Sequence, residues 1–138
     1  MNNFMLYKRI INKKTEEVIR DIKNKASDFN FIIRNIFDMA QNFKDHGVAV
    51  DANFKYYSIM LCNPEKAYQS ILAKNIRGAV LLPPKQVVVY PKNTDKTCVA
   101  YEAPDMDRLE KIMPDDKKFQ ESLYSSGQKI IELLDSLS

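Results

Sequence analysis

The segment FKYYSIMLCNPEKA, residues 54–67, carries the strongest structural signal in this chain. Its first eight residues have the length and the aromatic and branched side chains of a β-strand. Apolar side chains occupy both faces of that strand, so we expect it to be covered on both sides. Asn63-Pro64 then predicts an abrupt helix start, because asparagine caps helices and proline suits the first helical position.

Strand and helix patterns alternate on both sides of this segment. Further strands are expected at 4–11, 29–34, 86–90 and 97–101, with the third strand at 54–61. Helices are expected at about 15–26, 38–45, 63–77, 105–113 and 115–137, capped by Thr15, Asn63 and Asp115 among others. Hairpins mixed with helices predict an α+β fold, with a mainly antiparallel sheet and helices on one face.

The last of these helices is expected to be long and to have one apolar face. That face consists of Phe119, Leu123, Ile130, Leu134 and Leu137. Gly127 interrupts the stripe, either as a close-packing point or as a weak spot, since glycine costs roughly 1 kcal/mol against alanine in a helix.

Length and composition indicate a single cytoplasmic domain. The chain has 138 residues, of which 45% are hydrophobic. Its longest apolar run, residues 79–82, is too short to span a bilayer, so no membrane partner is expected. Lys8 and Arg9 interrupt the apolar N-terminal residues and exclude a signal-peptide core. The two cysteines fit a reducing compartment.

Charge is distributed unevenly along the chain. Residues 1–100 carry 16 Lys and Arg against 9 Asp and Glu, whereas residues 101–138 carry 5 against 9. A basic body is therefore followed by an acidic C-terminal segment. We expect the two to attract each other, within a protomer or across a dimer.

Several short motifs resemble the domain-of-unknown-function family 302. They are Leu61-Cys62-Asn63-Pro64, Ala67, Leu81-Leu82-Pro83, Val88-Val89-Tyr90, Val99 and Pro104, in the family's order. The resemblance covers roughly residues 5–104. It implies a curved antiparallel sheet, a TATA-binding-protein-like fold and a homodimer, with no established activity. We therefore divide the single domain 1–138 into a family-like core, 1–104, and a C-terminal helical extension, 105–138.

One departure from the family pattern limits the chemistry that the resemblance implies. The family has a cysteine after Leu-Leu-Pro, where this chain has Pro84. A thiol pair between Cys62 and that position is therefore excluded, which weakens dithiol or metal chemistry.

Cys62 is the main single-residue candidate. Its position before a helix N-terminus favours a thiolate, as in a reactive or ligand-binding cysteine, although most free cysteines are small buried hydrophobes. Cys98 is interpreted as packing. His46, the one histidine, is expected on the surface at a helix end and is only a weak metal candidate beside Cys62.

Four tyrosines lie on strands that we expect to be neighbours. They are Tyr56, Tyr57, Tyr90 and Tyr101. Such a group lines a ligand pocket, a core rim or a dimer interface, and we favour the interface.

A basic cluster near the N-terminus is the best candidate for nucleic-acid binding. It consists of Lys8, Arg9, Lys13 and Lys14. Glu16 and Glu17 follow at once and dilute its field, so ordinary solvated charge is the better interpretation. The usual nucleotide, hydrolase and metalloprotease motifs are missing from the sequence. It assigns no catalytic residue and no cofactor, and we lean against an enzyme.

These observations lead to three functional hypotheses. The first is a homodimeric binding or interaction module that pairs through its sheet or C-terminal helices and holds a small apolar ligand. The alternative is a thiol-dependent redox or metal- or haem-handling protein that uses Cys62, with His46 or a methionine as second ligand. Nucleic-acid binding is the third.

Overall fold

The computed structural model describes residues 4–81 and 85–138. Five antiparallel strands form one open sheet in the order β1-β5-β4-β3-β2. The strands are β1 (Phe4–Ile11), β2 (Ile32–Asp38), β3 (Tyr57–Cys62), β4 (Lys85–Pro91) and β5 (Thr97–Pro104). The expected α+β fold with an antiparallel sheet is confirmed.

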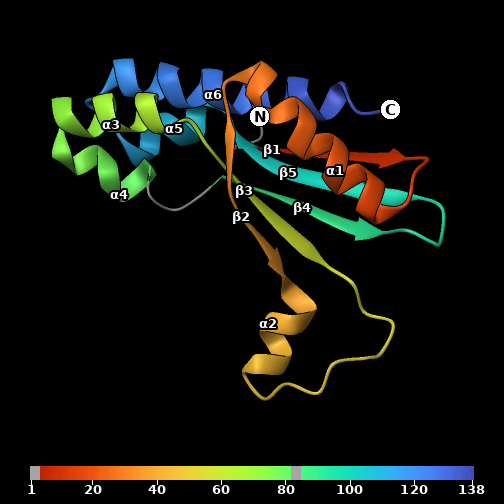
Figure 1. Cartoon of the computed structure of the whole chain (residues 1–138). Helices are drawn as coiled ribbons and strands as arrows, with labels where there is room; N and C mark the ends of the chain where they lie inside the picture. Colours follow the sequence, from red (N-terminus) through yellow and green to blue (C-terminus); the bar gives the residue numbers. More distant parts are fainter. Residues whose placement is uncertain (1–3, 82–84) are drawn as a thin grey trace.

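The helices surround this sheet unevenly. They are α1 (Thr15–Lys25), α2 (Met39–Asp45), α3 (Pro64–Ala73), α4 (Gly78–Leu81), α5 (Met106–Ile112) and α6 (Lys117–Asp135), with short 3-10 helices η1 (Ala26–Phe29) and η2 (Asn75–Arg77). Figure 1 shows α1 and α6 along one side of the sheet, α3 to α5 gathered at one end, and α2 projecting at the other. Within the described ranges, none of these helices is long and apolar enough to cross a bilayer.

The core lies between the sheet and the layer of α1 and α6. Ile59, Val87 and Val99 project from neighbouring strands and are fully buried. The apolar face predicted for the last helix is confirmed, because Phe119, Leu123, Ile130, Leu134 and Leu137 are all buried. Burying each large side chain contributes about 1.5–3 kcal/mol, so this layer accounts for much of the stability.

The opposite face of the sheet is open. Strand alternation places Leu6, Ile10 and Ile32 on it, and these side chains are 66%, 41% and 49% exposed. The third strand was expected to be covered on both sides, and no residue of β3 is exposed: Ser58, on the face away from α1 and α6, is buried and donates a hydrogen bond to Gln86.

Several strand and helix starts differ from the sequence prediction. The third strand, expected from Phe54, begins at Tyr57, because Asp51 to Phe54 form a turn closed by the Phe54 N–H bond to the Asp51 carbonyl oxygen. The second strand begins at Ile32 rather than Phe29, because η1 continues to Phe29 and Asn30 reverses the chain with a positive φ of 65°. Thr15 is the first residue of α1 and not its cap. Its buried hydroxyl lies 3.1 Å from Thr97 Oγ1 instead, so it joins α1 to β5.

The N-cap side chains of α3 and α6 form their hydrogen bonds at the same spacing along the chain. Asn63 accepts a hydrogen bond from the Lys66 backbone N–H, as predicted. Asp116, and not Asp115, caps α6 by accepting from the Phe119 N–H at 3.2 Å. Both caps bond to the third residue that follows them.

The third helix is shorter than predicted and less buried. It ends at Ala73, after which Arg77 closes η2 and Gly78 begins α4 instead of terminating a helix. Leu72 on α3 is 61% exposed. Leu82, Pro83 and Pro84 lie outside the described residues.

Candidate functional site

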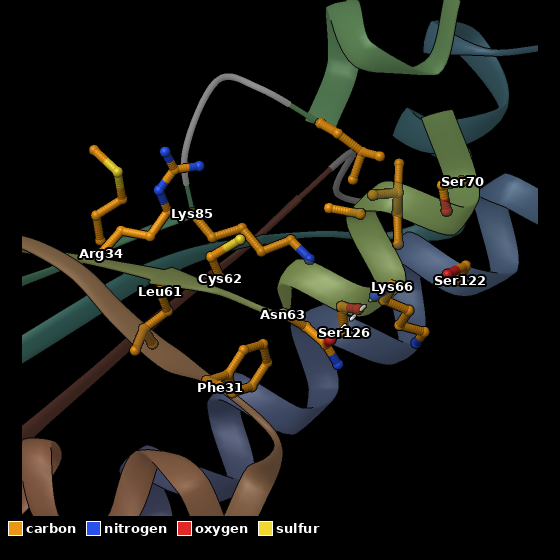
Figure 2. Close-up of a pocket in the computed structure, with 14 residues that line it drawn as sticks. Phe31, Arg34, Leu61, Cys62, Asn63, Lys66, Ser70, Lys85, Ser122 and Ser126 are labelled. Carbon is orange, nitrogen blue, oxygen red and sulfur yellow. Dashed lines mark hydrogen bonds between the residues drawn. The ribbon is translucent and has the colours of Figure 1, made fainter. Parts of the chain in front are cut away.

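A cleft opens where β3 runs into α3 and β4 begins, with α6 on its far side. Its volume is about 80 Å³, and Figure 2 shows the side chains that line it. Phe31, Leu61, Leu81 and Leu123 give it an apolar wall. Its polar groups come from several separate elements and are described in turn.

The strand-to-helix turn at Asn63 places two of these groups. Cys62 is the last residue of β3 and is half-buried in the cleft wall. Asn63 caps α3 through the Lys66 N–H at 3.2 Å, and Pro64 supplies the fixed φ of the first helical residue. The Lys66 side chain therefore leaves the first turn of α3 on the cleft side (Figure 2).

Lys85 supplies the third polar group. It is the first residue of β4 and pairs with Leu61 across the sheet. Its side chain is half-buried and extends past Cys62 toward the start of α3 (Figure 2). Burial lowers the pKa of Lys85 to about 8, the positive charge of Lys66 lowers it further, and Cys62 opposes this shift.

Arg34 reaches the cleft through an irregularity in β2. The register with β3 shifts between Ile33 and Asn35, which leaves Arg34 as the extra residue of a β-bulge. Bulges often turn a side chain toward a functional site. Arg34 lies at the exposed edge of the cleft (Figure 2).

Three cations line this cleft without a carboxylate in its described lining, although Glu102 lines the adjoining cleft together with Lys85. Arg34, Lys66 and Lys85 line the cleft, and no described lining residue is an aspartate or glutamate. None of the three forms an ion pair with a carboxylate in residues 4–81 or 85–138. The cleft is therefore apolar in its wall and positive in its charge.

The predicted tyrosines do not share this site. Tyr56 and Tyr90 stack on the open side of the sheet with ring centroids 5.2 Å apart, near the base of α2. Phe54 extends the stack, 6.0 Å from Tyr56. Tyr57 and Tyr101 lie on the helix-covered side, where burial raises the pKa of Tyr101 to about 12. Of the residues selected from the sequence, Cys62 alone lines the cleft.

His46 and Cys62 lie at opposite ends of the sheet. His46 follows α2, and its ring Nδ1 is 2.8 Å from the Asn42 carbonyl oxygen. The six residues of β3 separate the two ends by roughly 20 Å at about 3.3 Å per residue. In the part of the chain that the structure describes, no three His, Cys, Asp or Glu side chains form a metal-binding group. Cys98 is buried, as its packing interpretation requires.

Two members of the N-terminal basic cluster, Arg9 and Lys13, form contacts within the protein. Arg9 donates to the carbonyl oxygens of Leu134 and Asp135, at 2.7 and 3.2 Å, and Lys13 pairs with Asp21 at 2.8 Å. The attraction expected between the basic body and the acidic C-terminal segment occurs within one protomer in the ion pairs from Lys74 and Arg77 to Asp116.

Arg34, Lys66 and Lys85 were missed by sequence reasoning. One available signal was Lys85 itself, because it stands two residues before Val87, the first of three apolar strand residues, at a position that alternation assigns to the covered face. The bulge that directs Arg34 has no comparable sequence signal.

Comparison with known proteins identifies the family. The family described as domain of unknown function DUF302 matches residues 7–137. The chain belongs to the DUF302 family. A crystal structure of an uncharacterized conserved DUF302 protein from Bacillus stearothermophilus is similar, with a TM-score of 0.73, 20% identity, and coverage of 94% of this chain and 95% of that chain. At this identity the likeness establishes the fold of the DUF302 chain alone. No curated protein matches it.

Proposed function

We propose that this DUF302 protein is a homodimeric binding module whose cleft takes a small molecule with a compact apolar body and one anionic group. The observation that supports this most directly is the cluster of Arg34, Lys66 and Lys85 without a described carboxylate. A half-buried cation gains stability when an anion enters beside it, because burial has removed part of its hydration.

The size and lining of the cleft favour a compact ligand. Its volume of about 80 Å³ is roughly half that of the ~150 Å³ engineered cavity that holds benzene. Leu61, Leu81 and Leu123 provide apolar contact for a short alkyl portion. A short-chain carboxylate combines these properties, and benzoate tests the upper limit of size.

Calorimetric titration with propionate, butyrate, benzoate and inorganic phosphate tests this ligand class. We expect saturable binding of a carboxylate that Lys85→Met weakens at least about tenfold, which corresponds to about 1.4 kcal/mol. Lys92→Met, at an exposed position in the β4–β5 turn, is the matched control and should bind as the wild type does. Equal affinity in Lys85→Met and wild type, or the absence of saturable binding, would contradict the proposal.

The open face of the sheet supports the homodimer. Leu6 and Ile10 on β1 and Ile32 on β2 lie exposed on this face, at its two opposite edges, and exposed apolar surface marks interaction sites. The Tyr56–Tyr90 stack extends the same face toward α2. A second copy of the chain would remove this surface from water.

Native mass spectrometry at low micromolar concentration tests the dimer. We expect a dimer in the wild type and a shift to monomer in Leu6→Asp. Ile76→Asp is the matched control, because Ile76 in η2 is 67% exposed, nearly the same as Leu6, but lies outside the sheet. A monomeric wild-type protein would overturn the pairing.

A thiol function of Cys62 is the second candidate. The half-buried Cys62 thiol shares the cleft with Lys66 and Lys85, and cations favour the thiolate. Limited alkylation with iodoacetamide should modify Cys62 well before the buried Cys98, which serves as the internal control. Unchanged thiol labelling and unchanged haem and metal titrations in Cys62→Ser would remove this candidate.

A further inference from the structure

The amine of Lys85 has the surroundings of a carbonyl-binding group. We infer that the cleft captures a small 2-oxo acid as an imine on Lys85 Nζ, with the carboxylate of the acid held by Lys66. This inference rests on the proposed function and names its ligand class. It adds a reversible covalent bond that anion binding alone does not require.

Lys85 lacks two features that keep most lysines protonated, namely full hydration of the amine and a carboxylate paired with it in the described part of the chain. The Lys85 side chain passes through the cleft rather than into open water (Figure 2). It forms no ion pair with any carboxylate in the described ranges. A lysine that is desolvated beside another cation is a recognised way to prepare a nucleophilic amine.

The charges around Lys85 act in opposite directions: Lys66 lowers its pKa, and Cys62 opposes the shift. Charged or titratable side chains approach it as Arg34 from β2, Cys62 from β3, Lys66 from α3, Tyr101 and Glu102 from β5 and Arg108 from α5. Glu102 lies in an adjoining cleft and accepts a hydrogen bond from Arg108 at 3.2 Å. With its pKa lowered to about 8, roughly a tenth of Lys85 is neutral at neutral pH, far more than for an exposed lysine.

The chemical step balances without a further reactant. The lone pair of neutral Lys85 Nζ forms a bond to the ketone carbon, and the carbonyl π pair moves to oxygen. Proton transfer from nitrogen to that oxygen gives a neutral carbinolamine. The hydroxyl takes up one proton and leaves as water, and the product is a protonated imine. No electron donor or acceptor takes part, and Lys66 pairs with the carboxylate.

Trapping with pyruvate and sodium cyanoborohydride tests this directly on the full chain. Hydride from the reagent reduces the imine to a stable secondary amine, which peptide mapping by mass spectrometry locates. We expect adduct on Lys85 at least about tenfold faster than on the exposed Lys92, because Lys85 is partly neutral at neutral pH. Imine formation on Lys85 should level off above about pH 8, its lowered pKa.

One variant and two probes separate the outcomes. Lys85→Arg cannot form an imine, so it should lose the adduct. If propionate binds in a Lys85-dependent way but pyruvate leaves no adduct on Lys85, this inference fails and the anion-binding proposal stands. If neither binds, both fail. Adduct spread evenly over exposed lysines also overturns the inference, and the wild-type map decides this even where a variant does not fold.

Discussion

The guanidinium of Arg77 and the carboxylate of Asp116 form a two-pronged ion pair, with Nε–Oδ2 at 2.8 Å and Nη2–Oδ1 at 3.0 Å. Asp116 also caps α6, and the Arg77 guanidinium lies over the Phe119 ring at 5.2 Å from its centroid. The pair therefore joins the end of η2 to the start of α6. It fixes the helical layer that forms one side of the cleft.

This ion pair predicts a loss of stability in acid. Hydrogen bonding from Arg77, helped by the Phe119 N–H, lowers the pKa of Asp116 to about 2 from 3.8. Because the folded pKa is the lower one, the stabilisation is complete above 3.8 and is lost as the pH falls toward 2. Urea midpoints of wild type and Asp116→Asn should differ most at neutral pH and converge through that window. Asp115→Asn, an exposed neighbour, should show no such convergence; a constant difference for Asp116→Asn would contradict the assignment.

Gly127 predicts a stabilising substitution. A Cβ added there would lie 3.7 Å from the Tyr101 hydroxyl and 3.8 Å from the Ala103 Cβ, which are ordinary contact distances. Gly127→Ala should therefore gain up to roughly 1 kcal/mol from helix propensity. Gly47→Ala should lose about 1–2 kcal/mol, because Gly47 has a φ of +81°. Chemical denaturation measures both, and a destabilised Gly127→Ala would show that the site is too tight.

Truncation of Ile130 and of Leu72, two large aliphatic side chains, should change the free energy of unfolding by very different amounts. Ile130 on α6 is fully buried, so Ile130→Ala should cost roughly 2–5 kcal/mol through lost burial and the cavity left behind. Leu72 on α3 is 61% exposed, so Leu72→Ala should stay within about 0.5 kcal/mol. Equal losses in urea unfolding would mean that α3 is covered in solution.

Lys85 predicts a stability change in alkali. Its folded pKa of about 8 lies below the ordinary 10.5, so the unfolded chain binds more protons between these values. Stability therefore rises with pH in that window, by an amount on the order of 1–3 kcal/mol. Lys85→Met removes this group, so the difference in unfolding free energy between variant and wild type should shrink as the pH rises from 8 to 10.5. Lys92→Met should show a flat difference, and a flat difference for Lys85→Met would contradict the lowered pKa.

Local signals explain which parts of the fold were predictable. The Asn63-Pro64 motif and the apolar stripe from Phe119 to Leu137 are signals within short stretches of sequence. Each correctly predicted a helix at its position, α3 and α6. The resemblance on the Cys62 motif also gave the correct family. By contrast, the position of Asn30 in a left-handed turn depends on how η1 packs, so the start of β2 was misplaced.

The candidate site was less predictable because it is built from tertiary contacts. Lys66 lies on a helix, Lys85 on a strand, and Arg34 in a bulge that exists only once β2 pairs with β3. Sequence reasoning grouped the tyrosines because their strands are neighbours, but strand alternation places Tyr56 and Tyr57 on opposite faces.

β1 forms its sheet contacts with β5 alone, in a register that matches residues 4–11 with residues 97–104. Translation at about 5–20 residues per second leaves the N-terminal segment without its partner for several seconds while the intervening chain emerges. Folding of this edge must therefore wait until nearly the whole polypeptide has left the ribosome. A nascent chain stalled before residue 97 would expose β1 without its hydrogen-bonding partner. Unpaired strands pair with other chains, so such a stalled chain would tend to aggregate.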